Sequence, residues 1–228
     1  GENPGLAFEQ PILEMEQKIE ELKDLATSTR FELNGEIKSL QGRLQRRMRE
    51  IYSDLSAWDR VNVARHPQRP LVVDYIDRML DEFIELHGDR LYRDDKAIVT
   101  GLARIGEVRF MLVGHRKGKS TAERLESNFG CAHPEGYRKA LDKMRLAEKL
   151  GLPIVTLINT PGAYPGIGAE ERGQARAIAL NIMEMFRLEV PVVCLVIGEG
   201  GSGGALGIGI GDRILMLEHS YYSVISPE

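Results

Sequence analysis

The sequence is poor in cysteine and has no long apolar run. Only two of its 228 residues are cysteine, Cys131 and Cys194, which excludes a disulfide framework and a four-cysteine zinc site. No apolar stretch approaches the 18 residues that a membrane-spanning helix needs. Residues 1–8 lack the basic and apolar regions of a signal peptide. These features favour a protein of a reducing compartment that does not enter a membrane.

Positive charge is not in excess, and histidines are few. The chain has 30 Lys and Arg residues against 34 Asp and Glu, a formal net charge of −4, which argues against a general nucleic-acid-binding protein. The five histidines show no ligand spacing, and neither an H-E-x-x-H motif nor a paired-carboxylate signature is present. The sequence therefore predicts no metal site in this chain and offers no evident general base.

Two amphipathic stretches occupy the first part of the chain. Apolar residues recur at spacings of three and four over residues 12–26 and again over residues 37–55, with charged residues between them. Residues 27–35 form a plausible connection, so residues 1–65 are predicted to be an N-terminal helical hairpin. An arginine cluster in the second stretch is expected to be a solvated face: Arg43, Arg46, Arg47 and Arg49.

The remainder of the chain has the pattern of an α/β protein. Two prolines within residues 66–70 interrupt the helical pattern, and residues 66–96 are predicted to be a linker followed by a helix over residues 71–86. Residues 97–228 form the main predicted domain, whose alternation implies βαβ units. Its last predicted strand is followed directly by the chain end, so a C-terminal part is expected to be missing. The expected strands are 97–105, 108–113, 153–158, 190–197, 214–217 and 222–225, and the expected helices are 134–150 and 170–188.

Glycine is abundant, with 24 residues, and two glycine-rich segments each follow a predicted strand. They are residues 159–168 and residues 198–205. Glycine lets a backbone approach a ligand closely, and consecutive N–H groups at such a turn can bind a phosphate or an oxyanion that develops during a reaction. Because ligands of open α/β sheets bind at the carboxyl ends of the strands, we expect both segments to be functional.

Three familiar motifs match these regions loosely. Gly198, Gly200 and Gly203 spell G-x-G-x-x-G with Glu218 further on, as in dinucleotide-binding proteins, although glycines at 207, 209 and 211 weaken the required helix. Gly200, Ser202 and Gly204 spell the G-x-S-x-G of serine hydrolases, for which only His219, with Asp212 or Glu218, could complete a triad. Residues 114–120 resemble a P-loop but are one residue short between the glycines.

Several longer segments carry a family resemblance. They resemble the α-subunit family of the carboxyltransferase component of bacterial-type, multisubunit acetyl-coenzyme A carboxylase, and they extend over nearly the whole chain. The matching segments are residues 8–11, 64–70, 132–140, 160–166, 168–174, 196–205 and 222–228. The family continues past Glu228 into further helices that this chain lacks.

The resemblance implies a fold, a reaction and partners. The implied fold is crotonase-like (ClpP/crotonase), a superhelix of ββα units. The implied reaction moves CO₂ from carboxybiotin, which a biotin carboxyl carrier protein bears, to acetyl-CoA, giving malonyl-CoA for fatty-acid synthesis. The implied partners are a carboxyltransferase β subunit in an α₂β₂ heterotetramer, the carrier, and biotin carboxylase in the full complex. Any zinc would belong to the β subunit. The implied location is the cytoplasm, or the plastid stroma for a plant protein.

The resemblance also assigns roles to residues. The N–H groups of Gly203 and Gly204 form an oxyanion hole that stabilises a biotin enolate, with biotin itself serving as the base, and the N–H of Ala205 is a near alternative. Less specifically, five residues shape the carboxybiotin pocket: Gly162, Ala163, Tyr164, Pro165 and Gly166. Three basic residues are expected to meet CoA phosphates or the acidic carrier: Arg116, Lys117 and Lys119. Ser202 is then structural.

Three other interpretations remain open on the sequence. Ser202 could be the nucleophile of an acyl-CoA hydrolase or a ClpP-like serine hydrolase. The hairpin could bind partners in a non-catalytic scaffold whose glycines only allow close packing. A dinucleotide-binding protein is the remaining alternative.

Overall fold

The computed structural model describes residues 5–29 and 33–228. The chain divides into two compact units, Gly1–Val63 and Ala64–Glu228, and each is described by itself. No helix in the described part of the chain has the length and apolar character needed to cross a bilayer.

The N-terminal unit is built from the two predicted amphipathic helices, which the structure confirms. A 3₁₀ turn, η1 (Ala7–Glu9), leads into α1 (Gln10–Thr29), and α2 (Asn34–Ser53) follows, before α3 (Ala57–Ala64). The two long helices pack through Ile12 and Ile19 of α1 and Leu44 of α2, as their apolar spacing requires. The middle of the predicted connection, residues 30–32, lies outside the described residues.

The second unit contains a mixed sheet of seven strands. In spatial order the strands are β1 (Glu82–Glu85), β2 (Ile98–Ile105), β3 (Val108–His115), β4 (Ile154–Thr160), β5 (Val192–Gly201) and β6 (Arg213–Met216), and β7 (Tyr221–Ser223) also pairs with β5. The first three strands are antiparallel, and the pairings from β3 to β6, and of β7 with β5, are parallel. The coarse prediction of an α/β fold is therefore correct.

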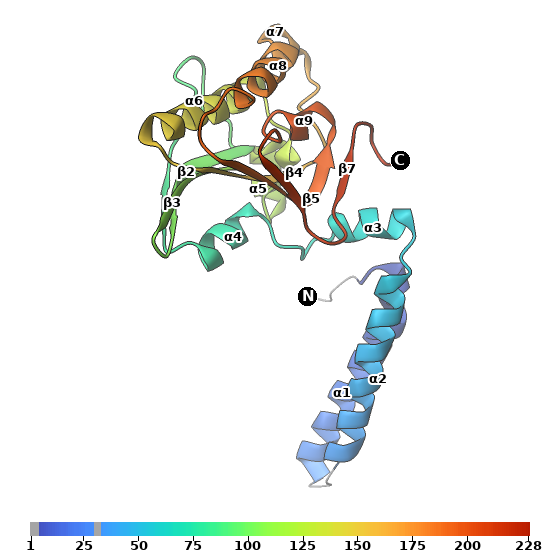
Figure 1. Ribbon diagram of the computed structural model, residues 1–228. Helices are drawn as coiled ribbons and strands as arrows, with labels where there is room; N and C mark the ends of the chain where they lie inside the picture. The colour runs from blue at the N-terminus through green and yellow to red at the C-terminus, as the bar shows by residue number, and fades with distance from the viewer. Residues whose placement is uncertain (1–4, 30–32) are drawn as a thin grey trace. The chain divides into compact units, whose positions relative to one another are not determined.

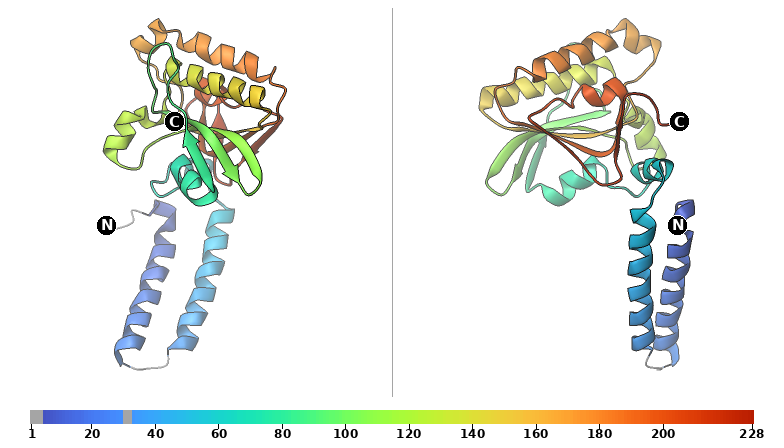
Figure 2. Two further views of the ribbon diagram at one scale, coloured as in Figure 1. Left: turned by 90° about the vertical axis from the view of Figure 1, so that its left-hand side faces the viewer. Right: turned by 45° about the vertical axis from the view of Figure 1, so that its right-hand side comes forward.

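Helices cover both faces of this sheet (Figure 1). On one face, α6 (Pro134–Leu150) and α8 (Gln174–Met185) lie side by side, as the views of Figure 2 agree. The core beneath them includes Tyr137, Met144 and Ile158. On the other face, α4 (Val72–Met79) packs against a second cluster that includes Val99 and Leu157. The predicted start of α6 at Pro134 and its end before Gly151, which has a φ of 64°, are confirmed.

Two helix predictions in this unit are wrong in part. The helix expected over residues 71–86 ends at Met79, because Leu80 is extended and Glu82–Glu85 pairs with β2 as a strand. The helix expected over residues 170–188 is two helices, α7 (Ile167–Glu171) and α8, because Gly173 lies between them with a φ of 81°. The predicted domain boundaries at residues 65 and 96 stay predictions.

The segments between β3 and α6, and after β5, position the site. α5 (Thr121–Glu126) is capped by the Ser120 hydroxyl, which accepts a hydrogen bond from the Glu123 N–H, and the turn η2 (Asn128–Gly130) follows it. β5 runs four residues further than predicted, to Gly201, and leads directly into α9 (Ser202–Leu206). The second glycine-rich segment is therefore half strand and half helix rather than a turn.

Candidate functional site

The two glycine-rich segments lie against each other at the carboxyl ends of β4 and β5. A Cβ atom at Gly201 would lie well under 3.0 Å from the carbonyl group of Pro161. A Cβ atom at Gly204 would lie equally close to the backbone of Gly162 and Ala163. Only glycine allows two backbones to come this close. The structure thus brings the predicted oxyanion segment and the predicted pocket segment into direct contact.

The first residues of α9 present N–H groups that the helix itself does not use. Gly203 and Gly204 are its second and third residues, where an N–H has no carbonyl four residues earlier in the helix. The N–H of Ala205, by contrast, is in register with the carbonyl of Gly201. Gly204 is buried whereas Gly203 is half-buried, and a Cβ at Gly203 would lie 3.7 Å from Ile178, an ordinary contact. Gly203 is therefore the more exposed of the two residues.

Side chains hold the first segment in place. The Thr160 hydroxyl donates to the Gly162 carbonyl at 2.8 Å and accepts from the Gly162 N–H at 3.1 Å. The Tyr164 N–H donates to the Ala132 carbonyl, and the Gln174 amide donates to the carbonyls of both Ala132 and Tyr164. These bonds fix the loop from both ends.

The five residues predicted to shape the carboxybiotin pocket do not all face one side. Gly162 and Ala163 lie against Gly204 of α9. The Tyr164 ring lies over Gly166 and stacks on the His133 ring, with centroids 4.1 Å apart. Pro165 is exposed. The structure therefore joins Gly162 and Ala163 to the oxyanion segment and places Tyr164 in a supporting position.

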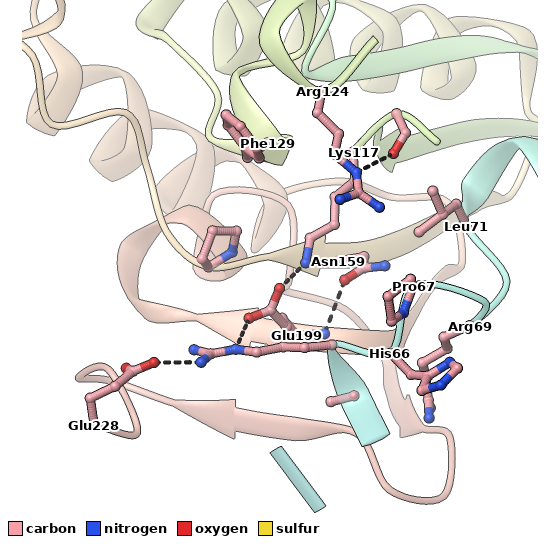
Figure 3. Close-up of a pocket in the computed structure, with 14 residues that line it drawn as sticks. His66, Pro67, Arg69, Leu71, Lys117, Arg124, Phe129, Asn159, Glu199 and Glu228 are labelled. Atoms are coloured by element: carbon pink, nitrogen blue, oxygen red, sulfur yellow. Dashed lines mark hydrogen bonds and ion pairs between the residues drawn. The ribbon is translucent and has the colours of Figure 1, made fainter. Parts of the chain in front are cut away.

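A cavity of about 440 Å³ adjoins both segments (Figure 3). Asn159 at the end of β4 and Glu199 near the end of β5 contribute to it, as does Pro161 of the first segment. The rest of the wall comes from the start of this unit and from the region around α5 and η2. The other lining residues are Ala64, Arg65, His66, Pro67, Arg69, Leu71, Lys117, Gly118, Arg124, Phe129 and Glu228.

Buried Glu199 organises the floor of this cavity. Its carboxylate accepts from the Arg65 Nε at 2.7 Å and from the Tyr221 hydroxyl at 2.8 Å, and it forms an ion pair with the Lys117 ammonium. Its backbone N–H donates to the Asn159 side chain at 3.1 Å. Arg65 also pairs with Glu228, so Arg65 and Lys117 are balanced by two carboxylates. The further positive charge in the cavity wall comes from Arg124, which fits an anionic ligand.

Burial also lowers the pKa values of two side chains beside the glycine-rich segments, Lys117 and His115. It lowers the pKa of Lys117 to about 7, and the charge of Arg65 adds to this effect. Burial lowers the pKa of His115 to about 3, with the Lys117 charge adding to it and the Gly204 carbonyl opposing it. His115 is therefore neutral, and its Nδ1 accepts a hydrogen bond from the Asn159 N–H at 3.3 Å.

Comparison with known proteins settles the family. A model of the family described as acetyl co-enzyme A carboxylase carboxyltransferase-like matches residues 5–228. The chain belongs to this family. The acetyl-coenzyme A carboxylase carboxyl transferase subunit alpha of Xanthomonas campestris is 58% identical over 227 residues, which are 99% of this chain and 71% of that protein. The subunit of the same name from Thiobacillus denitrificans is 57% identical over 223 residues, or 69% of its length. The resemblance found in the sequence is confirmed.

Solved structures of carboxylases share the fold. The transcarboxylase 12S structure has a TM-score of 0.59 at 20% identity, over 69% of this chain and 30% of that chain. The β subunit of geranyl-CoA carboxylase from P. aeruginosa has a TM-score of 0.57 at 24% identity, over 70% of this chain and 32% of that chain. At these identities the likeness concerns the fold alone.

The structure separates the three basic residues that the family resemblance grouped. Lys117 lies in the cavity beside the glycine segments. Arg116 instead pairs with Glu85 at 3.3 Å and Lys119 with Asp74 at 2.5 Å, and both line a second cavity that does not reach these segments. In this carboxyltransferase-like chain, only Lys117 of the three adjoins the candidate site.

Sequence reasoning missed most residues of the cavity, among them four on which its charge and its aromatic wall depend: Arg65, Arg124, Phe129 and Glu199. Two of them gave a signal in the sequence, because Glu199 is the one carboxylate inside a glycine-rich segment and Arg65 lies in a segment that matches the family.

The dinucleotide-binding alternative is not supported, because α9 ends at Leu206, after five residues. Within the described residues, no group of His, Cys, Asp and Glu side chains could hold a metal ion.

Proposed function

We propose that this chain is a carboxyltransferase α subunit that transfers CO₂ from carboxybiotin to acetyl-CoA, giving malonyl-CoA. The family supports the activity, and the relatives named subunit alpha support its place in a larger enzyme. Its partners in this proposal are a β subunit in an α₂β₂ assembly, the biotin carboxyl carrier protein and biotin carboxylase. A crotonase-like superhelix of ββα units and a cytoplasmic location belong to the same proposal.

One observation carries the proposal: the N–H of half-buried Gly203 lies in the first turn of α9, in a segment that packs against the Gly162 turn and contributes Glu199 to the cavity. The cavity fits a carboxylated ureido ring because Arg124 has no carboxylate partner among the described residues, while Arg65 and Lys117 are paired with Glu199 and Glu228. Carboxybiotin supplies the activated carboxyl group when it is bound. This chain contributes no metal in the proposal.

In this proposal the residues of this chain hold the carboxyl group and polarise the ureido oxygen of carboxybiotin. When carboxybiotin is bound, the N–H groups of Gly203 and Gly204 would donate hydrogen bonds to its ureido oxygen and would stabilise negative charge there. A preorganised donor of this kind contributes about 3–4 kcal/mol to the transition state. Lys117 and Arg65 hold the carboxyl group near this point, and Glu199 keeps both cations in place. The acetyl-CoA thioester is held by the β subunit in this proposal.

Reconstitution tests the proposal. The chain alone is expected to be nearly inactive, and mixing it with a carboxyltransferase β subunit should produce malonyl-CoA-dependent carboxylation of biocytin. Gly203→Ala should retain activity, since its Cβ has room. Gly204→Val is the poorer probe, because its side chain would force the two segments apart. A reconstituted complex that assembles but transfers no carboxyl group would refute the proposal.

A serine hydrolase is the second candidate, and one observation favours it. Ser202 is exposed and has a φ of 51°, the strained geometry of a nucleophile at a strand-to-helix turn. Labelling of Ser202 by a fluorophosphonate, abolished in Ser202→Ala, would support this candidate. In the carboxyltransferase proposal Ser202→Ala instead retains most of the activity.

A further inference from the structure

Phe129 has an unusual backbone conformation for its size. Its φ is 56° and its ψ is 24°, between Asn128 with a φ of 47° and Gly130 with a φ of 84°. Asparagine and glycine adopt this left-handed conformation readily, whereas a bulky side chain there is a genuine outlier. Such a conformation persists only where the surroundings impose it, and it is concentrated at functional sites.

The neighbouring residues impose this turn. A Cβ at Gly130 would lie 2.9 Å from the Lys117 side chain and 3.0 Å from the Asn159 carbonyl, so the chain passes close to both. The Gly130 N–H donates to the Ser127 carbonyl at 2.8 Å, and the Asn128 amide lies 3.3 Å from the His133 ring nitrogen. The turn is therefore held without help from the Phe129 ring.

The ring itself is not used to build the core. Phe129 is 50% exposed and lines the cavity that contains Lys117 and Glu199. A strained backbone that presents a half-exposed aromatic ring gains little stability from that ring. Its placement is better explained by a ligand that the ring would contact.

Arg124 lies in the wall of the same cavity as Phe129. The Arg124 Nε donates weakly to the Gly118 carbonyl at 3.4 Å, and no carboxylate in the described part of the chain pairs with its guanidinium. Figure 3 shows Phe129 and Arg124 on the same side of the cavity, with Lys117 reaching from there toward Glu199. A flat apolar face thus lies next to an uncommitted cation.

We propose that the Phe129 ring stacks on the flat ureido ring of the biotin group and that Arg124 meets the carboxyl group attached to it. This inference rests on the proposed function and names the residues that select its ligand. The adenine ring of CoA is also flat and carries phosphates nearby. The cavity adjoins Pro161 and the glycine segments, however, where the carboxyl group must lie, and the adenine end of CoA is remote from its thioester.

Equilibrium binding to the reconstituted α–β complex tests the role of the ring. Biotin methyl ester is the probe because it lacks carboxylate groups, and saturation-transfer NMR gives its Kd. Phe129→Leu, which removes the ring but keeps the strain, should weaken binding about tenfold, in the range of an aromatic stacking contact. Arg124→Gln should leave this Kd within twofold, because the probe has no carboxyl group for Arg124 to meet.

Thermal unfolding separates a ligand contact from a structural role. Phe129→Gly removes both the ring and the strain, so its unfolding midpoint should equal that of the wild type or exceed it by about 2–4 °C while biotin methyl ester binding is lost. Phe186→Leu is the matched control, because Phe186 is 74% exposed and lies after α8, away from the cavity. It should change neither measurement.

Three results would overturn the inference. The first is unchanged binding of biotin methyl ester in Phe129→Leu. The second is an unfolding midpoint of Phe129→Gly well below that of the wild type. The third is a raised KM for malonyl-CoA in Phe129→Leu together with unchanged binding of biotin methyl ester, which would place the ring against CoA. A wild-type complex that neither binds the probe nor transfers carboxyl groups would instead refute the proposed function itself.

Discussion

The two glycine-rich segments lie at the same edge of the sheet but differ in structure. The first is a loop, and hydrogen bonds from Thr160 and Gln174 hold its carbonyls and its N–H groups. The second is the end of β5 and the start of α9, and it is held by the sheet on one side and by the helix on the other. The first segment is therefore a support with occupied backbone groups, whereas the second presents backbone donors.

This difference predicts which substitutions matter. In the second segment glycine is required for close approach, so an added methyl group is costly at some positions and harmless at others. In the first segment the supporting side chains are required, so removing one hydroxyl should loosen the loop.

Gly201→Ala should have the largest effect. Its Cβ would collide with the Pro161 carbonyl and push the two segments apart. Overpacking of this kind costs about 1–3 kcal/mol of stability. Because a displacement near 1 Å can cost about 100-fold in rate, we expect kcat to fall at least that far. Carboxyl transfer and urea unfolding of the reconstituted complex measure both effects.

Gly203→Ala is the control for this variant, since its Cβ meets only Ile178, at 3.7 Å. It should keep kcat within about threefold of the wild type, as a well-accommodated methyl group should. Equal losses in the two variants would show that the steric contrast between neighbouring glycines has no functional meaning.

Thr160→Val should have an intermediate effect. Valine keeps the shape of threonine but removes both hydrogen bonds to Gly162, at a cost of about 1–2 kcal/mol. The loosened loop should lower kcat about tenfold, as a partial misplacement of the site would. Steady-state kinetics and thermal unfolding test this expectation.

Thr156→Val is the matched comparison on the same strand. The Thr156 hydroxyl is buried and lies by the Cys194 thiol, a weak hydrogen-bond partner, so its removal should change stability little. If both valine variants behave alike, the Thr160 bonds do not hold the loop.

His115 contacts both segments and should have the smallest effect on kcat, because its replacement is expected to change the pH dependence of stability instead. Its pKa is about 3 in the folded protein and 6.5 for the free side chain, so the unfolded chain binds more protons between these values. Stability should therefore fall as the pH is lowered below about 6.5, by up to about 1.4 kcal/mol per pH unit. His115→Gln, which keeps an acceptor for the Asn159 N–H, should show a shallower slope.

Urea unfolding at pH 7.5, 6.5 and 5.5 measures these slopes, with His87→Gln as the control because His87 is exposed. Identical slopes for the wild type and His115→Gln would mean that His115 is not buried in its neutral form.

Periodicity and glycine position were sufficient to predict much of this arrangement. The spacing of Ile12, Ile19 and Leu44 predicted the helical hairpin, and the bracketing of α6 by Pro134 and Gly151 was read correctly. The strand β1 was missed because its pairing with β2 is a tertiary interaction that the local helical pattern obscured. The break at Gly173 was missed because a glycine inside a helical pattern is often tolerated.

The candidate site was only partly predictable, for a physical reason. The glycine segments are visible in the sequence because they need a special residue type. Arg65 and Lys117 are 134 and 82 residues away from Glu199, and only the fold shows that they share its carboxylate. The conformation of Phe129 gives no sequence signal either, because nothing in the residue type reveals a left-handed backbone.

The most direct test removes a single backbone N–H. Replacing Gly203 by glycolic acid turns its amide into an ester, which deletes the donor and leaves every side chain unchanged. The same change at Gly35, which is the second residue of α2 as Gly203 is of α9, is the control. The account predicts that kcat of the reconstituted complex falls about 10²–10³-fold for the ester at 203 and stays unchanged for the ester at 35. A kcat within about twofold of the wild type for both esters would contradict the role of the backbone donor.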